Sequence, residues 1–269
     1  MGNYKSVSRD AWAYLASHGC DSSQPYGPEE FGAARNWLDS RGWIPWNRVE
    51  SVLCLACGGG QQAPLFASLG CNVTLADISP DQLKIDRSAA EQYGLAIDCI
   101  ETDMLQLSAL YGHDFDLVYQ AVSACYVPNV KKLYEEVFRV LKPGGHYFVQ
   151  HWNPVHVQLA AKQAWDGSAY RVARPQVVGK PIQTPMAWDE KTGKATVDCW
   201  HYIHPLNHLI GGLCEAGFAI LRFAESEEAD VLAEPGSHAH LAAYLPSFYS
   251  IFARRREAIR RKRSVPSTA

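Results

Sequence analysis

The fold of this chain is decided by Ser51-Val-Leu-Cys-Leu-Ala-Cys-Gly-Gly-Gly60, which is followed by Asn72-Val-Thr-Leu-Ala-Asp77. These segments are typical of a strand that ends in a glycine turn and of a second strand that ends in a carboxylate, with a helix over roughly residues 61–69 between them. Glycines suit the turn because a side chain would hinder a sharp bend and a close approach to a ligand. The helix then points its first N–H groups at that ligand. The pattern predicts a nucleotide-cofactor site.

The position of Asp77 favours the same interpretation. Asp77 comes 19 residues after Gly58, a spacing at which a carboxylate at the tip of the second strand accepts hydrogen bonds from a ribose. These features alone fit NAD as well as S-adenosylmethionine.

Short apolar segments alternate with helical ones from about residue 50 to residue 150, which predicts a parallel sheet with helices on both faces. Further on, Pro205 opens a helix that Gly217 closes. The carboxyl edge of such a sheet holds the ligands. We expect seven strands, at residues 51–56, 72–77, 97–101, 115–120, 145–150, 218–223 and 247–252.

Two further segments separate the possible cofactors. Thr102-Asp-Met104 follows the third expected strand, and Leu141-Lys-Pro-Gly-Gly145 leads into the fifth. With the glycine turn, Asp77 and the strand at 115–119, they resemble the class I S-adenosylmethionine-dependent methyltransferases (type 11-like). The resemblance implies an α/β fold with a Rossmann-like, doubly wound, seven-stranded and mostly parallel sheet. It also implies S-adenosyl-L-methionine as cofactor and S-adenosyl-L-homocysteine as product. A dehydrogenase has no place for the two segments.

The resemblance implies roles for individual residues around the cofactor. Asp77 would hold the ribose hydroxyls, with Ile78 beneath the adenine. Asp103 would meet the exocyclic amine of the adenine, and Met104 would cover its face. The expected cofactor-binding residues, which include two at the methionine end, are Ala56, Cys57, Gly58, Gly60, Asp77, Ile78, Gln82, Asp103, Met104, Gln120 and Val122.

The glycine turn departs from the family pattern at two positions. Ala56 occupies the place of the first glycine and Cys54 that of an acidic residue, whereas Gly58 and Gly60 are kept. Alanine adds one methyl group and tolerates most turns with negative φ, so we expect cofactor binding to survive. The departures, and the lack of an obvious catalytic base, leave open a non-catalytic module that binds S-adenosylmethionine.

Methyl transfer is an in-line displacement, so much of its acceleration can come from positioning the acceptor and excluding water. An oxygen acceptor needs a base, whereas a neutral amine or a thiolate can do without one. Histidine can serve as that base, and aromatic faces can hold cations. We expect His151, Tyr126 and His204 as catalytic candidates, and Tyr26, Ser123, Trp152, Asn153 and Tyr202 as substrate-binding candidates.

The chain is expected to have three regions. Residues 1–48, rich in aromatic side chains and amphipathic over 28–40, are expected to form a helical N-terminal cap. Residues 49–253 are expected to form the methyltransferase domain, and residues 254–269 a basic C-terminal tail.

An insertion at 153–200, between the fifth strand and the following helix, is the least family-like part and is interpreted as a lid over the acceptor site. We expect a helical piece at 155–165 and a hairpin at 186–200 that turns at 191–193. A cap and a lid can enclose a small ligand, so the leading hypothesis is methylation of a small molecule on N, O or S.

Charge is distributed unevenly. The chain has 25 Lys and Arg and 28 Asp and Glu, and residues 254–263 hold seven of the basic residues and one of the acidic ones. The body is therefore acidic and the tail basic. We expect the tail to pair with the acidic body, and the absence of aromatic interleaving disfavours nucleic acid as a partner. Methylation of RNA or protein through the tail is the alternative.

Length and composition fit one α/β domain with additions, at 269 residues and 47% hydrophobic content. The sequence contains no run of about 18 apolar residues, so no membrane span is predicted, and we expect a cytoplasmic location by default. Cys54 and Cys57 form a Cys-x-x-Cys, but no second pair follows at zinc spacing. We therefore expect reduced thiols and no metal.

Overall fold

The computed structural model describes residues 3–159, 165–188 and 195–257. Among these residues the centre is a seven-stranded sheet in the order β3-β2-β1-β4-β5-β9-β8. The five strands β3, β2, β1, β4 and β5 run parallel to one another. Strand β9 is antiparallel to both of its neighbours, β5 and β8. This confirms the expected fold class. The strands are β1 (Ser51–Leu55), β2 (Asn72–Asp77), β3 (Ile97–Glu101), β4 (Phe115–Gln120), β5 (Leu141–Trp152), β8 (Phe218–Glu225) and β9 (Phe248–Arg255).

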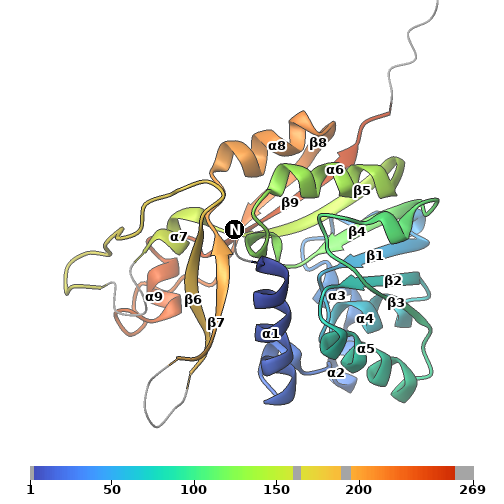
Figure 1. Cartoon of the computed structure of the whole chain (residues 1–269), viewed down its shortest axis with the longest axis horizontal. Coiled ribbons are helices and arrows are strands. Elements are labelled where there is room, and N and C mark those ends of the chain that lie inside the picture. Colours follow the sequence, from blue (N-terminus) through green and yellow to red (C-terminus); the bar gives the residue numbers. More distant parts are fainter. Residues whose placement is uncertain (1–2, 160–164, 189–194, 258–269) are drawn as a thin grey trace, which may run out of the picture.

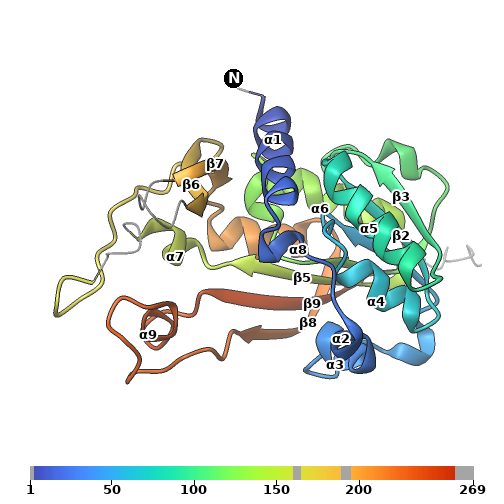
Figure 2. The same ribbon diagram turned by 90° about the horizontal axis from the view of Figure 1, so that it is seen from below.

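Helices cover both faces of this sheet (Figures 1 and 2). Helix α4 packs on β2 and α5 on β3, whereas α6 packs on β5 and α8 on β8. The expected helical cap is present at the N-terminus as α1 to α3. The helices are α1 (Tyr4–Ser17), α2 (Pro28–Gly32), α3 (Ala34–Leu38), α4 (Gln62–Ser68), α5 (Pro80–Gln92), α6 (Val130–Val140), α7 (Pro154–Gln158), α8 (Gly212–Glu215) and α9 (His238–Ala242).

Strand β1 contributes to two separate hydrophobic cores because successive side chains of a strand point to opposite faces. Leu53 and Leu55 belong to the core beneath α6 and α8, and Val52 and Cys54 to the core beneath α3 and α4. All four side chains are fully buried. The continuous apolar run that marks the strand in the sequence therefore reflects burial on both faces.

Helix α6 follows from its apolar spacing. Val130, Leu133, Val137 and Val140 lie on one face and are buried, at the three- and four-residue intervals of an amphipathic helix. The side chain of Asn129 caps the helix by accepting a hydrogen bond from the Lys132 N–H. This cap fixes where the chain leaves the carboxyl edge of β4.

Strand β5 is longer than expected, since it already begins at Leu141. Its pairing with β4 shifts between Phe115 and Leu117, so that Lys142-Pro-Gly-Gly145 bulges out of the ladder. A Cβ at Gly145 would lie 2.9 Å from the Lys142 carbonyl oxygen and 3.0 Å from that of Phe115. Only glycine fits there, so the packing of the backbone explains the glycine at this position without any ligand.

The insertion after β5 holds a hairpin of β6 (Pro181–Trp188) and β7 (Ala195–Tyr202), which form a sheet of their own beside α1 (Figure 1). The hairpin begins five residues earlier than expected. The expected helix at 155–165 is wrong in extent, because α7 ends at Gln158 and Leu159 bridges to Val172. The expected turn at 191–193 lies outside the described residues.

Two further differences concern element ends. The stretch at 28–40 forms two short helices rather than one, because Ala33, with φ −118°, leaves helical geometry between them. Strand β9 runs on to Arg255, so the first two arginines of the basic segment belong to the sheet. Residues 258–269 lie outside the described part. No helix among the described residues is long and apolar enough to cross a membrane.

Candidate active site

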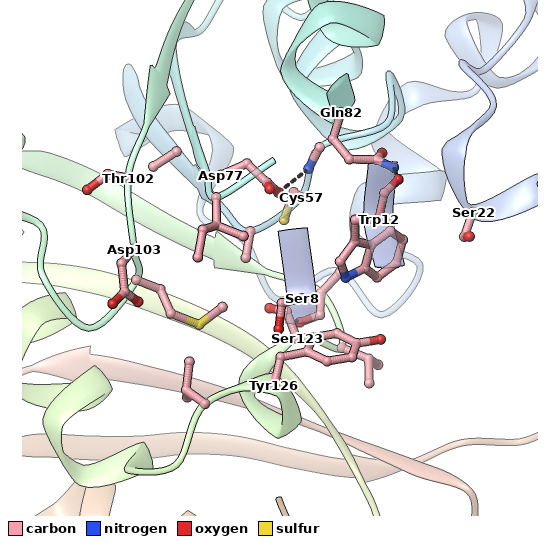
Figure 3. Close-up of a pocket in the computed structure, with 18 of the residues that line it drawn as sticks. Ser8, Trp12, Ser22, Cys57, Asp77, Gln82, Thr102, Asp103, Ser123 and Tyr126 are labelled. Atoms are coloured by element: carbon pink, nitrogen blue, oxygen red, sulfur yellow. Dashed lines mark hydrogen bonds between the residues drawn. The ribbon is translucent and has the colours of Figure 1, made fainter. Parts of the chain in front are cut away.

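A cavity of about 260 Å³ lies at the carboxyl edge of β1, β2 and β4, where a parallel sheet is expected to bind its ligand. Its walls come from the glycine turn, from the residues that follow β2, β3 and β4, and from α1. In Figure 3, Asp103 and Trp12 lie on opposite sides of Asp77. The cavity therefore has two ends, one beside Asp103 and one beside Trp12.

Asp77 holds the glycine turn against β2. Its Oδ2 accepts a hydrogen bond from the Gly58 N–H at 3.0 Å, and its Oδ1 accepts one from the Ser79 N–H at 2.9 Å. Burial raises the pKa of Asp77, and the N–H groups of Ser79, Gly58 and Ile78 oppose that rise. A Cβ at Gly58 would lie 2.6 Å from the Gln82 Cβ and 3.0 Å from Asp77 Oδ2. The turn thus needs glycine to lie this close to the carboxylate.

A second buried carboxylate supports the turn from below. Asp86 in α5 is fully buried, and its Oδ2 accepts a hydrogen bond from the Gly59 N–H at 2.7 Å. Burial raises the pKa of Asp86 to about 7, against the lowering effect of the Gly59 and Gly60 N–H groups. The sequence analysis missed this residue. The sequence did offer an indication, because Asp86 is an acidic residue on the face of α5 that otherwise carries apolar side chains such as Leu83 and Ala90.

Ala56 is the non-glycine residue with positive φ among those described, at φ 50°. The expectation that alanine would meet a turn with negative φ at this position is therefore wrong. Its backbone adopts the left-handed conformation that the family's glycine would adopt freely, at a cost of about 1–2 kcal/mol for an L-residue. The turn keeps its shape, and the chain carries the strain.

The end of the cavity beside Asp103 is closed by α1. The Tyr4 hydroxyl donates to Asp103 Oδ2 at 2.6 Å, and Lys5 Nζ lies 2.8 Å from the same oxygen. The Leu105 N–H donates to the other carboxylate oxygen. Arg9 donates to the carbonyl oxygen of Ile78. Helix α1 is thus fixed over the loops that follow β2 and β3.

Three side chains of α1 line the cavity, and the sequence analysis missed them: Tyr4, Ser8 and Trp12. They are spaced four residues apart and so share one face of the helix. Gln82 secures this arrangement, because its Nε2 donates to the carbonyl oxygen of Trp12 at 2.9 Å and to Ser23 Oγ at 2.7 Å. The helical spacing of Tyr4, Ser8 and Trp12 was the signal available in the sequence.

At the other end of the cavity, Trp12 meets Tyr126 edge to face, with ring centroids 5.7 Å apart. Tyr126 belongs to a 3₁₀ turn (Ala124–Tyr126) after β4 and is backed by His201 of β7 at 4.9 Å. Burial raises the pKa of Tyr126 well above its ordinary value. Ser123 lies beside this turn and accepts a hydrogen bond from Gln120 Nε2 at 2.8 Å. This end of the cavity is aromatic and uncharged among the described residues.

The two expected catalytic histidines lie outside this cavity. His151 Nε2 is 3.0 Å from the Tyr134 hydroxyl, which itself donates to the Leu209 carbonyl oxygen, so the imidazole is the donor. His204 Nε2 donates to the carbonyl oxygen of Ala124 at 3.1 Å. Burial lowers the pKa of His151 to about 3 and that of His204 to about 4. Both lie in the core as neutral hydrogen-bond donors.

Most of the expected site residues meet at the cavity. Those that line it are Ala56, Cys57, Gly58, Asp77, Ile78, Gln82, Asp103, Met104, Val122, Ser123 and Tyr126. A separate cavity of about 10 Å³, enough for one water, is lined by His151, Trp152, Tyr202 and His204.

Four expected residues line neither cavity. The Gly60 carbonyl oxygen accepts from the Tyr26 N–H at 3.2 Å, away from the main cavity. Asn153 caps α7 and donates to the Pro246 carbonyl oxygen. Gln120 is fully buried behind the wall and accepts from the Tyr147 hydroxyl.

The hairpin, interpreted from sequence as a lid over the acceptor, does not contribute to the cavity wall among the described residues. It packs behind the wall instead. Cys199 Sγ of β7 is 3.9 Å from Ser8 Oγ of α1, and His201 backs Tyr126. Helix α1 is therefore the element that covers the cavity directly, and the hairpin supports it.

The eight cysteines are free thiols. Cys57 lines the cavity, and its Sγ lies 3.3 Å from the Leu55 carbonyl oxygen. Burial raises the pKa of Cys57 to about 12 and that of Cys54 well above its ordinary value. This is the opposite of what a redox-active or metal-binding thiolate needs.

Comparison with known proteins agrees with this geometry. A family profile described as a methyltransferase domain matches residues 53–149. The uncharacterized methyltransferase YbaJ of Bacillus subtilis is 33% identical over 190 residues, which cover 71% of this chain and 74% of that protein. The ubiquinone biosynthesis O-methyltransferase of Pseudomonas aeruginosa is 29% identical over 118 residues, 44% of this chain and 50% of that enzyme.

A solved structure shares the fold at low identity. The S-adenosylmethionine-dependent methyltransferase of Mesorhizobium loti superposes with a TM-score of 0.60 at 23% identity, over 84% of this chain and all of that chain. At this identity the likeness shows that the two chains have the same fold. The chain belongs to the family of S-adenosylmethionine-dependent methyltransferases.

Proposed function

We propose that the protein transfers the methyl group of S-adenosylmethionine to a nitrogen, oxygen or sulfur atom of a small molecule held at the end of the cavity beside Trp12 and Tyr126. The observation that carries this proposal is the enclosure of the cavity. Helix α1 covers it and places the side chains of Tyr4, Ser8 and Trp12 in its wall. A relative named for O-methylation in ubiquinone biosynthesis supports a small-molecule acceptor.

The cofactor would lie along the two carboxylates. Asp77 faces the glycine turn and would accept hydrogen bonds from the ribose hydroxyls, while its existing bonds to Gly58 and Ser79 hold it in place. Asp103 would accept from the adenine amine, with Ile78 and Met104 against the ring. The cofactor supplies a methyl group on a sulfonium, which is electrophilic without further activation.

The acceptor end would work by positioning. The Trp12 and Tyr126 rings offer flat faces that can hold an apolar or cationic acceptor and exclude water. The raised pKa of Tyr126 keeps its phenol protonated, so we assign the side chain to binding rather than to proton removal. His151 and His204 donate to core oxygens and would support the wall from behind.

The test is to incubate the purified protein with methyl-labelled S-adenosylmethionine and a cell extract, and to separate small molecules, proteins and nucleic acids. We expect label in the small-molecule fraction. Asp77→Ala should abolish it, and Asp81→Ala, an exposed acid at the start of α5, should not. Label in RNA or protein that depends on Asp77 would replace the proposal by methylation of a macromolecule. S-adenosylhomocysteine binding without label in any fraction would favour a non-catalytic binding module.

A further inference from the structure

A second concave site of about 560 Å³ lies at the opposite, amino edge of the sheet. Arg48, ahead of β1, forms one side of it, the start of β5 forms its floor, and Arg254 and Arg256 at the end of β9 form the other side. Because β5 and β9 are antiparallel, the first half of β5 meets the last half of β9, and His146 pairs with Arg254. Figure 1 shows this end of β9 at the far end of the molecule from the β6–β7 hairpin.

The charges of this groove are mostly uncompensated. Arg48, Arg254 and Arg256 are exposed, and none of them has an ion pair or a side-chain hydrogen bond with another described residue. Elsewhere, arginines such as Arg9 and Arg41 pair with acids. Three guanidinium groups without a described partner, one from ahead of β1 and two from the end of β9, therefore face one concavity.

The other charged side chains of the groove are largely occupied. Lys142 pairs with Asp116 at 2.7 Å, and Asp116 also accepts from the Ser51 hydroxyl. The Arg255 guanidinium donates to carbonyl oxygens at the end of α6, among them that of Phe138 at 2.8 Å. Glu257 is the remaining acid of the lining. The groove keeps an excess of positive charge on a protein whose body is acidic.

His146 lies on the floor of the groove and reports this positive field. Its ring stacks on Phe252, with centroids 5.0 Å apart. Burial lowers the pKa of His146, and Arg254 and Arg48 lower it further, while Asp116 opposes them. Both arginines are therefore close enough to act together on one group in the groove.

We propose that this groove binds a multiply charged phosphate group, as carried by a nucleotide or another small phosphorylated compound. Arginine binds phosphate oxygens through a planar fork of N–H donors, and three such forks can share one di- or triphosphate. The volume of the groove suits a small ligand, and the acidic body disfavours a long polyanion. The groove lies at the opposite sheet edge from the methyl-transfer cavity, so its ligand is separate from cofactor and acceptor.

The first test is a calorimetric titration of the full chain with inorganic triphosphate at moderate salt. We expect a saturable site with Kd below about 1 mM. The variant Arg48→Gln/Arg254→Gln/Arg256→Gln should weaken it about tenfold or more. The control Arg87→Gln/Arg171→Gln/Arg222→Gln removes the same charge from exposed positions elsewhere and should leave Kd within about twofold. Unchanged S-adenosylhomocysteine binding verifies that both variants are folded. No saturable binding, or equal loss in both variants, would overturn the proposal.

A second readout follows His146 by NMR. Bound triphosphate offsets the field of Arg254 and Arg48, so saturation should raise the pKa of His146, while the NMR signals of the exposed His18 should not change. Triphosphate binding that leaves His146 unchanged would place the anion elsewhere and contradict the assignment.

Two further titrations identify the source of the phosphate. ATP that binds at least as tightly as triphosphate, and loses affinity in the groove variant, would assign the group to a nucleotide. Vesicles of phosphatidylcholine with a tenth of phosphatidylinositol phosphate test a lipid headgroup. Groove-dependent binding of either supports the phosphate site. Binding of single-stranded RNA together with no binding of triphosphate would instead replace it by a polyanion surface.

Discussion

The two ends of the methyl-transfer cavity are built in different ways. At the cofactor end, the glycine turn and the two carboxylates that hold it through backbone N–H groups, Asp77 and Asp86, come from one continuous stretch. The acceptor end comes from residues far apart in sequence, Trp12 of α1 and Tyr126 after β4, with His201 of the hairpin behind them. The conformation of the glycine turn is thus specified by residues near it in the sequence. The acceptor end exists only when remote segments pack together.

This difference predicts that a substitution at the glycine turn has the largest effect, and that it weakens cofactor binding. Asp77→Ala removes the carboxylate that would hold the ribose and also frees the Gly58 and Ser79 N–H groups. Charge-assisted hydrogen bonds contribute about 1.5–3 kcal/mol each, so we expect S-adenosylhomocysteine affinity to fall about 100-fold or more by calorimetry. Asp81→Ala, at an exposed position in the first turn of α5, should change this affinity less than twofold. If the two variants lost S-adenosylhomocysteine affinity to a similar extent, Asp77 would not be the residue that determines cofactor binding.

The histidines behind the acceptor end predict an effect on stability rather than on chemistry. The pKa of His204 is lowered to about 4 by burial, below the value of about 6.5 in the unfolded chain. Above pH 6.5 neither state binds the proton. As the pH falls from 6.5 towards 4 only the unfolded state gains it, so stability is lost in this window.

The variant His204→Gln lacks this titration. Between pH 7 and pH 5 it should lose about 2 kcal/mol less of the free energy of unfolding than the parent does, as measured with urea at each pH. Activity of His204→Gln should stay within a fewfold at pH 7.5. A large loss of kcat with an unchanged urea midpoint would instead restore His204 as a catalytic residue.

At the acceptor end, Tyr126 tests whether an aromatic face or a phenol is required. Tyr126→Phe keeps the ring beside Trp12 and His201, and we expect near-parental activity. Tyr126→Leu keeps an apolar side chain but loses the aromatic face, so kcat/KM for the acceptor should fall about tenfold. S-adenosylhomocysteine affinity should change less than twofold in both. An equal loss in Tyr126→Phe would show that the hydroxyl takes part.

The same difference explains what the sequence could predict. The alternating strands and helices and the position of Asp77 followed from local patterns, because strands and turns are specified by neighbouring residues. The seven-stranded sheet and the roles of Asp103 and Met104 were implied by the family resemblance. The covering helix α1 was expected only as a helical cap, since which face of it meets the sheet edge depends on contacts such as Tyr4 with Asp103. His151 was expected after the fifth strand, but it lies within β5, and the strand turns it towards Tyr134 in the core. Such orientations arise from tertiary packing.

The smallest effect concerns the strain at Ala56, which occupies the place of the family's first glycine. Ala56→Gly should relieve the cost of φ 50°, about 1–2 kcal/mol. Glycine also gives the unfolded chain more conformational freedom, which lowers the free energy of unfolding by about 0.5–1 kcal/mol. We expect a net gain of about 0.5 kcal/mol in the free energy of unfolding, measured by urea denaturation.

Ala67→Gly in α4 is the matched control, because a helical alanine gains nothing from glycine, and it should lose about 1 kcal/mol. If Ala56→Gly lost as much as Ala67→Gly, the turn would not be strained. A gain at Ala56 with unchanged S-adenosylhomocysteine affinity would show that the support from Asp77 and Asp86 imposes the shape of the turn on an unfavourable residue. The cofactor end would then be specified by its carboxylates as much as by its glycines.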